Sequence, residues 1–159
     1  MSEASDNVIQ HALQTIAEFE EIYKHLHRTP ELSWQEHGTA AFVTEQLQKM
    51  NTRGGDEDFK IITGIGGTGV VGILHNGPGK KVLLRAELDA LPLKEETGLP
   101  YSSQNSGRDE HTGSEIPAMH ACGHDMHMTS LLCAAQALSD RIWLTGFFRR
   151  GTAYASLTT

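Results

Sequence analysis

The chain has 159 residues, of which 38% are hydrophobic and 21% are charged, as in one ordinary globular domain or part of a larger one. Its formal net charge of -7 argues against a nucleic-acid partner, and no apolar run is long enough to span a membrane. The polar, acidic start "MSEASDNV" lacks a secretory signal pattern, and two cysteines could form at most one disulfide. We therefore expect a cytoplasmic protein that binds neither nucleic acid nor membrane.

Two helices are predicted in the N-terminal third. Apolar residues at three- and four-residue spacing predict an amphipathic helix from about Val8 to His27, and Pro30 ends it. Ser33 and Glu36 fit the capping box S-x-x-E, which predicts that a second helix begins there and stops near Asn51.

The middle of the chain predicts strands and turns. Apolar and β-branched runs indicate three strands: Phe59–Thr63, Gly69–Leu74 and Val82–Ala86. The Asn76-Gly77 step predicts a hairpin that joins the last two. "GIGGTG", which ends at Gly69, matches the dinucleotide-binding pattern, but a strand follows it where that pattern requires a helix. A glycine-rich turn between strands is the better interpretation.

The remaining segments complete an α/β pattern. Tyr101–Glu115 is polar and is predicted to be an extended surface loop, and a last helix is predicted over His124–Ser139. Helix and strand signals alternate along the chain, which is typical of an α/β fold with a mixed sheet.

Two carboxylates follow the third predicted strand. Its apolar residues run directly into Glu87 and Asp89. Ligands of α/β proteins bind beyond the carboxyl ends of strands, so these side chains are well placed for chemistry. On this segment alone, solvated acids that close a strand are the simpler interpretation.

A histidine- and cysteine-rich stretch, "HACGHD", begins at His120. Cys122 and His124 are separated by one glycine just before the last predicted helix, so a thiolate and an imidazole can converge on zinc or a similar divalent ion. His120 could equally be an ordinary loop residue, and His127 could lie on the exposed face of the helix.

Four segments in this order resemble the metal-dependent amidohydrolases: "LHRTPELSWQEHGTAAFV", "GIGGTGVVGIL", "LLRAELDALPL" and "HACGHDMHMTSLL". That family includes hippurate hydrolases, aminoacylases and plant indole-acetyl-amino-acid hydrolases, and it belongs to a zinc-peptidase clan that also contains carboxypeptidases. The resemblance covers roughly Ile9 to Asp140. It implies a zinc-exopeptidase-like catalytic domain with a mixed sheet, and hydrolysis of the amide bond of N-acyl amino acids or short peptides.

The resemblance also implies a metal centre. Two divalent ions (zinc, manganese or cobalt) would activate the attacking water, in a homodimer with a lid or dimerisation domain. Cys122 and His124 resemble metal ligands, and Asp89 resembles a catalytic aspartate that orients a metal-bound ligand. Further residues are expected around the metal: Glu87, His120, Asp125 and His127.

The resemblance stops after Asp140. The family continues with a Gln-Pro-Ala-Glu-Glu motif that supplies the general base and a further metal ligand, whereas this sequence has no Glu or Asp after Asp140 and no His after His127. We therefore expect residues 1–140 to be the N-terminal part of the catalytic domain and residues 141–159 to be a divergent tail, out of register. The lid domain and the general-base glutamate would be absent, the metal site partial, and this chain a truncated, inactive form.

Two alternatives remain open. The chain could be a fragment of a metallo-carboxypeptidase or dipeptidase, which the segments present cannot separate from an amidohydrolase. It could also be a non-catalytic metal-binding protein.

Overall fold

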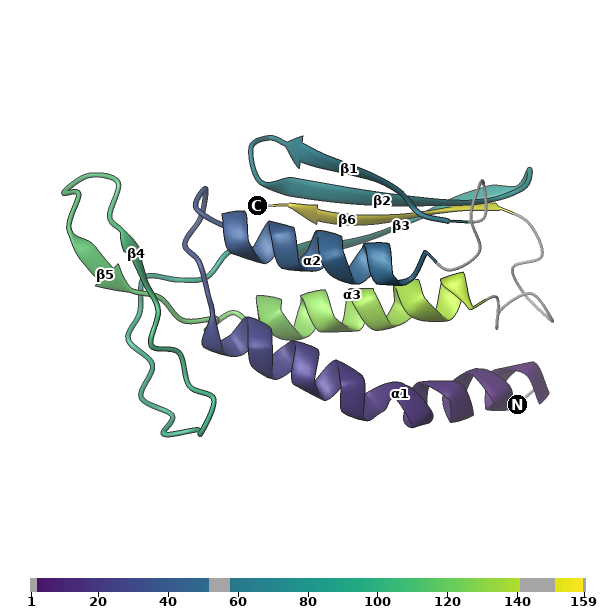
Figure 1. Ribbon diagram of the computed structural model, residues 1–159, viewed down its shortest axis with the longest axis horizontal. Coiled ribbons are helices and arrows are strands. Elements are labelled where there is room, and N and C mark those ends of the chain that lie inside the picture. The colour runs from purple at the N-terminus through teal and green to yellow at the C-terminus, as the bar shows by residue number, and fades with distance from the viewer. Residues whose placement is uncertain (1–2, 52–57, 141–150, 159) are drawn as a thin grey trace.

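The computed structural model describes residues 3–51, 58–140 and 151–158 of the chain. Its helices are α1 (Glu3–Arg28), α2 (His37–Lys49) and α3 (His124–Ser139). Its strands are β1 (Lys60–Ile65), β2 (Gly69–Asn76), β3 (Lys80–Glu87), β4 (Ser106–Arg108), β5 (Glu115–Pro117) and β6 (Gly151–Thr158). Figure 1 shows the larger sheet as one layer, α2 and α3 against one of its faces, and α1 on the far side of α3. The predicted α/β class is confirmed, and the last helix has the predicted bounds.

The larger sheet is mixed, in the strand order β1-β2-β6-β3. Strand β6 pairs antiparallel with β2 and parallel with β3, so it lies between them. The predicted hairpin between β2 and β3 is therefore wrong, although Gly77 does turn the chain, with φ at 78°. Neighbouring strands lie about 4.8 Å apart, and the residues between β2 and β3 are enough to cross the roughly 10 Å over an intervening strand.

Strand β6 comes from the segment predicted to be a divergent tail. Ala155 and Leu157 on this strand are 3% and 0% exposed, and they alternate with less buried residues. This period of two is that of a strand with one face against a core. Residues 151–158 thus contribute a strand that is paired on both sides.

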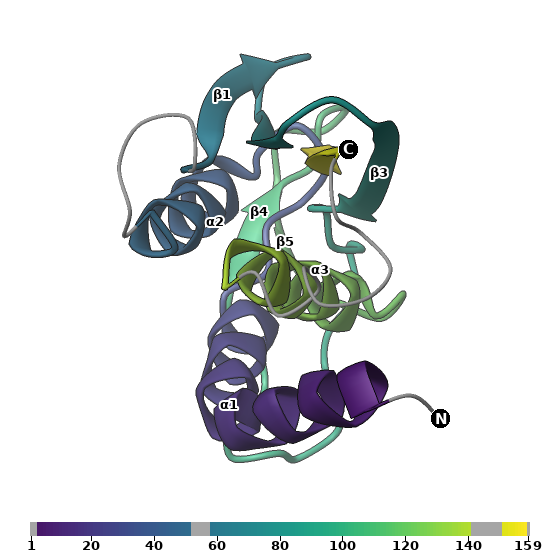
Figure 2. The same cartoon turned by 90° about the vertical axis from the view of Figure 1, so that its right-hand side faces the viewer.

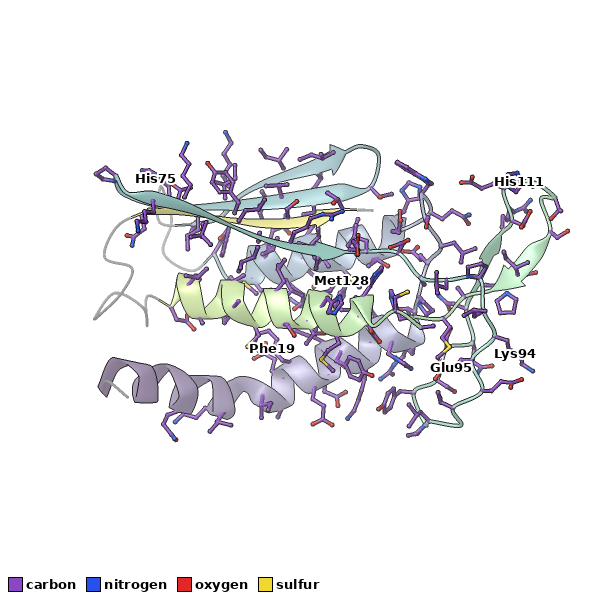
Figure 3. The ribbon with its side chains drawn as sticks, turned by 180° about the vertical axis from the view of Figure 1, so that it is seen from behind. Phe19, His75, Lys94, Glu95, His111 and Met128 are labelled. Atoms are coloured by element: carbon purple, nitrogen blue, oxygen red, sulfur yellow. The ribbon has the colours of Figure 1, made fainter. Side chains whose placement is uncertain are left out.

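The core lies between the larger sheet and the helices. Figure 3 shows Phe19 in the space between α1 and α3, and Met128 on α3. The largest wholly buried side chains include Leu26, Leu47, Leu88, Met128, Leu132 and Leu157. On the opposite face of the sheet, Leu83 is 63% exposed and Ile62 is 38% exposed. The helices therefore bury only one face of the sheet in the part of the chain that the structure describes.

Helix α2 begins differently from the prediction. Glu36 is its N-cap residue but makes no side-chain capping hydrogen bond, and Ser33 lies outside the helix. The cap is Glu31, whose carboxylate accepts hydrogen bonds from the backbone N–H groups of Gly38 and Thr39 at 3.0 and 2.6 Å. The predicted capping box is therefore wrong, because a carboxylate that arrives from the preceding turn satisfies the free N–H groups of this helix.

The predicted surface loop contains a small hairpin. Strands β4 and β5 pair antiparallel within and just beyond Tyr101–Glu115. Figure 1 shows this hairpin at one end of the molecule, beyond the larger sheet and the helices, and Figure 2, which looks from the opposite end, shows it behind α3. The prediction of a loop without strands is wrong here, because the pairing of β4 with β5 is decided by backbone contacts that no local pattern marks.

The glycine-rich turn is confirmed. Strand β1 ends at Ile65 and β2 starts at Gly69, and between them Gly66 and Gly67 have φ values of 63° and 117°. These values lie in the region that glycine adopts at no steric cost. None of the helices in the described ranges is both long and apolar enough to cross a membrane.

Candidate active site

The carboxyl end of β3 meets the first turn of α3. Glu87 is the last residue of β3, and His124 is the first residue of α3. His124 Nδ1 donates to the backbone carbonyl of Asp89 at 2.9 Å and to its carboxylate Oδ1 at 3.0 Å. His124 Nε2 lies 3.2 Å from Glu87 Oε2. The fold therefore brings together three of the residues that the sequence singled out, on two separate motifs.

These contacts define what the imidazole of His124 can do. Because Nδ1 donates to Asp89, the neutral ring carries its lone pair on Nε2. That lone pair faces the carboxylate of Glu87, and two acceptors at 3.2 Å attract each other only through a proton or a cation shared between them. Glu87 Oε2 and His124 Nε2 thus offer two neighbouring ligand atoms to a divalent ion.

The residues fit part of a metal site. Cys122 is a free, exposed thiol, and Gly123, with φ at 79°, turns the chain between it and His124. Thiolate, imidazole and carboxylate together are a donor set that suits zinc and similar ions. Among the residues that the structure describes, however, no group of three or more such side chains is placed to hold a metal ion.

A second histidine lies between two carboxylates in the interior. His27, in the last turn of α1, has Nδ1 2.7 Å from Asp125 Oδ2 and Nε2 3.1 Å from Glu95 Oε1. The three side chains are 7%, 3% and 0% exposed. Figure 3 places Glu95 near the end of α1 and the start of α3. We call His27, Glu95 and Asp125 the buried network.

Each charged group of the buried network stabilises the charged form of its neighbours. Burial lowers the pKa of His27, but hydrogen bonds and charge from Asp125 and Glu95 outweigh it, so the pKa is raised above 6.5. Burial raises the pKa of Glu95, but hydrogen bonds from Thr97, Ser103 and His27 outweigh it, so this pKa is lowered. Both shifts favour an imidazolium ion held between carboxylates.

The other two histidines of the motif differ from each other. His120 is 5% exposed, and burial lowers its pKa, opposed by the charge of Asp125. Neither of its ring nitrogens has a hydrogen-bond partner among the described residues. His127 is exposed on α3, with its ring 5.9 Å from that of His124.

Three residues of these clusters were not predicted. His27 stands in the first resembling segment, but its helical spacing gives no functional signal. Glu95 lies in a polar segment with no motif, and Ser33 was assigned to a helix cap. Instead, Ser33 Oγ donates to Asp89 Oδ2 at 2.6 Å. Each of the three is recognisable only by a partner that is distant in the sequence.

Comparison with known proteins supports the family resemblance. Residues 83–145, which include the end of β3, the whole "HACGHD" stretch and α3, match peptidase family M20/M25/M40. The family resemblance is confirmed. Relatives in this family are hydrolases that act on amide bonds.

Two relatives show how much of the family the chain spans. It is 41% identical over 136 residues to the hippurate hydrolase of Campylobacter jejuni, covering 85% of this chain and 31% of the relative. It is 39% identical over 121 residues to the N-acetyldiaminopimelate deacetylase of Oceanobacillus iheyensis, covering 76% of this chain and 29% of the relative. The chain therefore spans about a third of the length of these relatives.

Solved structures agree with the fold. A protein from methicillin-resistant Staphylococcus aureus superposes with a TM-score of 0.78 at 30% identity, covering 96% of this chain and 35% of that one. The Bacillus subtilis YXEP protein, described as a dinuclear metal binding peptidase of the M20 family, superposes with a TM-score of 0.68 at 28% identity, covering 89% of this chain and 34% of that one. The described elements are thus a partial domain of the M20 fold.

Proposed function

We propose that this chain carries part of the active site of a metal-dependent amidohydrolase that cleaves the amide bond of N-acyl amino acids. The observation that carries the proposal is the convergence of Glu87, Asp89 and His124 where β3 meets α3. The names of the relatives support the substrate class, because hippurate and N-acetyldiaminopimelate are both N-acyl amino acids.

Each residue of the site has a role in this proposal. Cys122 and His124 would bind a divalent ion (zinc, manganese or cobalt), and Glu87 would add a carboxylate oxygen beside Nε2. Asp89 accepts hydrogen bonds from His124 Nδ1–H and so fixes the tautomer that leaves Nε2 free. When bound, divalent ions would acidify the attacking water and stabilise the oxyanion.

The buried network would hold the site in place without touching the substrate. His124 and Asp125 are consecutive residues of α3, and they bind partners on different elements: His124 contacts Asp89 just beyond β3, and Asp125 contacts His27 of α1. The first turn of α3 is therefore fixed from two directions. Such fixation is what a metal site needs to keep its ligands in one geometry.

We propose further that the chain by itself does not hydrolyse amides. A catalytic metal site needs about three protein ligands and a general base. Among the residues that the structure describes, no group of three or more possible ligands is placed to hold a metal ion. Residues 1–140 would then be the N-terminal part of the catalytic domain, and activity would require the segments that the longer relatives supply.

A chimaera tests this proposal. Residues 1–140 would replace the matching segment of the C. jejuni hippurate hydrolase, and hippurate hydrolysis would be measured with Zn²⁺, Mn²⁺ or Co²⁺ added. We expect metal-dependent hydrolysis that is lost in Cys122→Ala and in His124→Ala. His111→Ala, at an exposed histidine of the β4–β5 turn labelled in Figure 3, is the matched control and should stay active.

The same experiment separates a second candidate function. The chain is also 38% identical over 120 residues to thermostable carboxypeptidase 2 of Saccharolobus solfataricus. This similarity supports the cleavage of short peptides as the second candidate function. If the chimaera folds and binds metal but cleaves neither hippurate nor a dipeptide, while the parent enzyme is active, a catalytic role for these residues is wrong.

A further inference from the structure

We propose that Ser33 is a positioning residue of the candidate active site: its hydroxyl holds the carboxylate of Asp89 in the orientation that leaves His124 Nε2 free for a divalent cation. This inference rests on the proposed function, because it concerns the same site.

The contact of Ser33 completes a chain of hydrogen bonds. Ser33 Oγ donates to Asp89 Oδ2 at 2.6 Å, and Asp89 Oδ1 accepts from His124 Nδ1 at 3.0 Å. The two oxygens of one carboxylate thus have different partners. Rotation about the terminal torsion of an Asp side chain is otherwise soft, so the hydroxyl determines which way the carboxylate faces.

The backbone brings Ser33 to this place and holds it there. Leu32 forms a parallel bridge with Ala90, next to Asp89, and its carbonyl accepts from the N–H of Gln35 at 2.9 Å, which closes a turn around Ser33. The segment that follows the first helix is therefore tied to the extension of β3.

The residue after Ser33 has a backbone conformation that depends on its surroundings. Trp34 has φ at 66°, the left-handed region that a bulky side chain rarely adopts. Its N–H donates to Glu36 Oε1 at 2.9 Å, and Glu36 Oε2 accepts from Thr68 Oγ1 at 2.8 Å. Glu36 is wholly buried. A strained turn that is held by a buried carboxylate beside the site is the kind of local strain that marks functional positions.

The pair that fitted a capping box therefore serves the site. Neither Ser33 nor Glu36 caps α2, because Glu31 does so. Glu36 instead fixes the turn, and Ser33 uses that turn to reach Asp89. Without the hydroxyl, the carboxylate would be free to rotate away from His124. The Asp89 backbone carbonyl, 2.9 Å from Nδ1, would then be the one acceptor that remains fixed, and the Nε2–H tautomer of His124 would gain population.

The test measures the tautomer of His124 in the whole chain without metal. Long-range ¹H–¹⁵N NMR spectra at a pH where the ring is neutral give the ratio of the two tautomers, and His124→Gln assigns the signals. We expect the wild type to be almost entirely Nδ1–H, and Ser33→Ala to raise the Nε2–H form severalfold. Ser33→Thr, which keeps the hydroxyl, should retain the wild-type ratio.

Two controls separate positioning from a general loss of structure. Ser130→Ala removes a hydroxyl that donates to the Met126 carbonyl on the exposed face of α3, and it should change nothing at His124. In an Asp89→Asn background, Ser33→Ala should add no further change, because Ser33 acts through that carboxylate. If Ser33→Ala does not fold, Ser33→Cys, with a similar volume and only a weak donor, replaces it.

A metal titration provides a second readout. Removing a residue that hydrogen-bonds to a metal ligand weakens metal binding about 10- to 100-fold. Ser33 is one hydrogen bond further from the metal than Asp89, so we expect the Kd for Zn²⁺ to rise up to about tenfold in Ser33→Ala. Failure of the wild type to bind Zn²⁺ would count against the proposed function, while the tautomer ratio would still test Ser33. Three outcomes would overturn the inference. The tautomer ratio of His124 could be unchanged in Ser33→Ala, or Ser33→Thr could change it as much as Ser33→Ala does. Ser33→Ala could also shift the ratio as much in the Asp89→Asn background as in the wild type.

Discussion

Two histidines of this molecule are each held between two carboxylates, in opposite surroundings. His27 lies 2.7 and 3.1 Å from Asp125 and Glu95, and all three side chains are at most 7% exposed. His124 lies 3.0 and 3.2 Å from Asp89 and Glu87, whose side chains are 19% and 42% exposed. The contacts are nearly the same, but the solvent around them differs.

The difference in solvent exposure gives the two clusters different roles. In the buried network, removing one partner would leave a charge in a medium that solvates it poorly, so the three groups depend on one another. At the end of β3, water screens the carboxylates, and Glu87 lies 3.2 Å from His124 Nε2. We infer that the first cluster stabilises the fold and that the second is available for binding.

The largest effect is expected from Asp125→Ala. This change leaves the imidazole of His27 buried with only Glu95 opposite it, and loss of one partner of a buried ion pair costs about 3–5 kcal/mol. Urea denaturation would measure the unfolding free energy. Glu21→Ala, at an exposed pair with Lys24 on α1, is the control and should stay near the wild type. A change in Asp125→Ala as small as in the control would contradict the structural role.

A smaller effect should appear as a pH dependence of stability. The pKa of His27 is raised above 6.5, so its contribution is complete below that pH and is lost as the pH rises through the raised value. The pKa of Glu95 is lowered below 4.5, so its contribution is complete above that pH and is lost as the pH falls through the lowered value. The difference in unfolding free energy between the wild type and His27→Gln should therefore be largest between 4.5 and 6.5. A difference that stays flat from acid to alkaline pH would refute the assignment.

The smallest effect on stability is expected at the end of β3. Glu87 is 42% exposed, so Glu87→Gln should change the unfolding free energy by less than about 1 kcal/mol. The same variant should reduce the rise in Tm that Zn²⁺ produces in the wild type, because a ligand stabilises the folded state in proportion to its affinity. A large loss of stability without metal, as in Asp125→Ala, would remove the distinction between the two clusters.

The sequence predicted much of the local structure, for physical reasons. Helix α3 has the predicted bounds because its apolar residues repeat at helical spacing and Gly123 marks its start. The turn at Gly66 and Gly67 was predictable because only glycine adopts those φ values freely. Glu87 and Asp89 were candidates because they follow a predicted strand, and His124 was a candidate because one glycine separates it from Cys122 just before a predicted helix.

The errors come from pairings that no local pattern encodes. The Asn76-Gly77 turn is present, but β6 lies between the strands that it was expected to join. Ser33 and Glu36 have the spacing of a capping box, yet Glu31 caps the helix. In each case a local signal had two possible uses, and contacts elsewhere in the fold selected one.

The sequence alone therefore determined the α/β class, the family resemblance and the residues that stand near the end of β3 and the start of α3, because these depend on short-range periodicity and on motifs. The tertiary structure alone decided the partners. Ser33 meets Asp89 across 56 positions, His27 meets Glu95 across 68, and His27 meets Asp125 across 98. Hydrogen bonds act over a few ångströms in space whatever the separation along the chain, so only the folded chain shows which charges are paired in the interior and which are paired near the solvent.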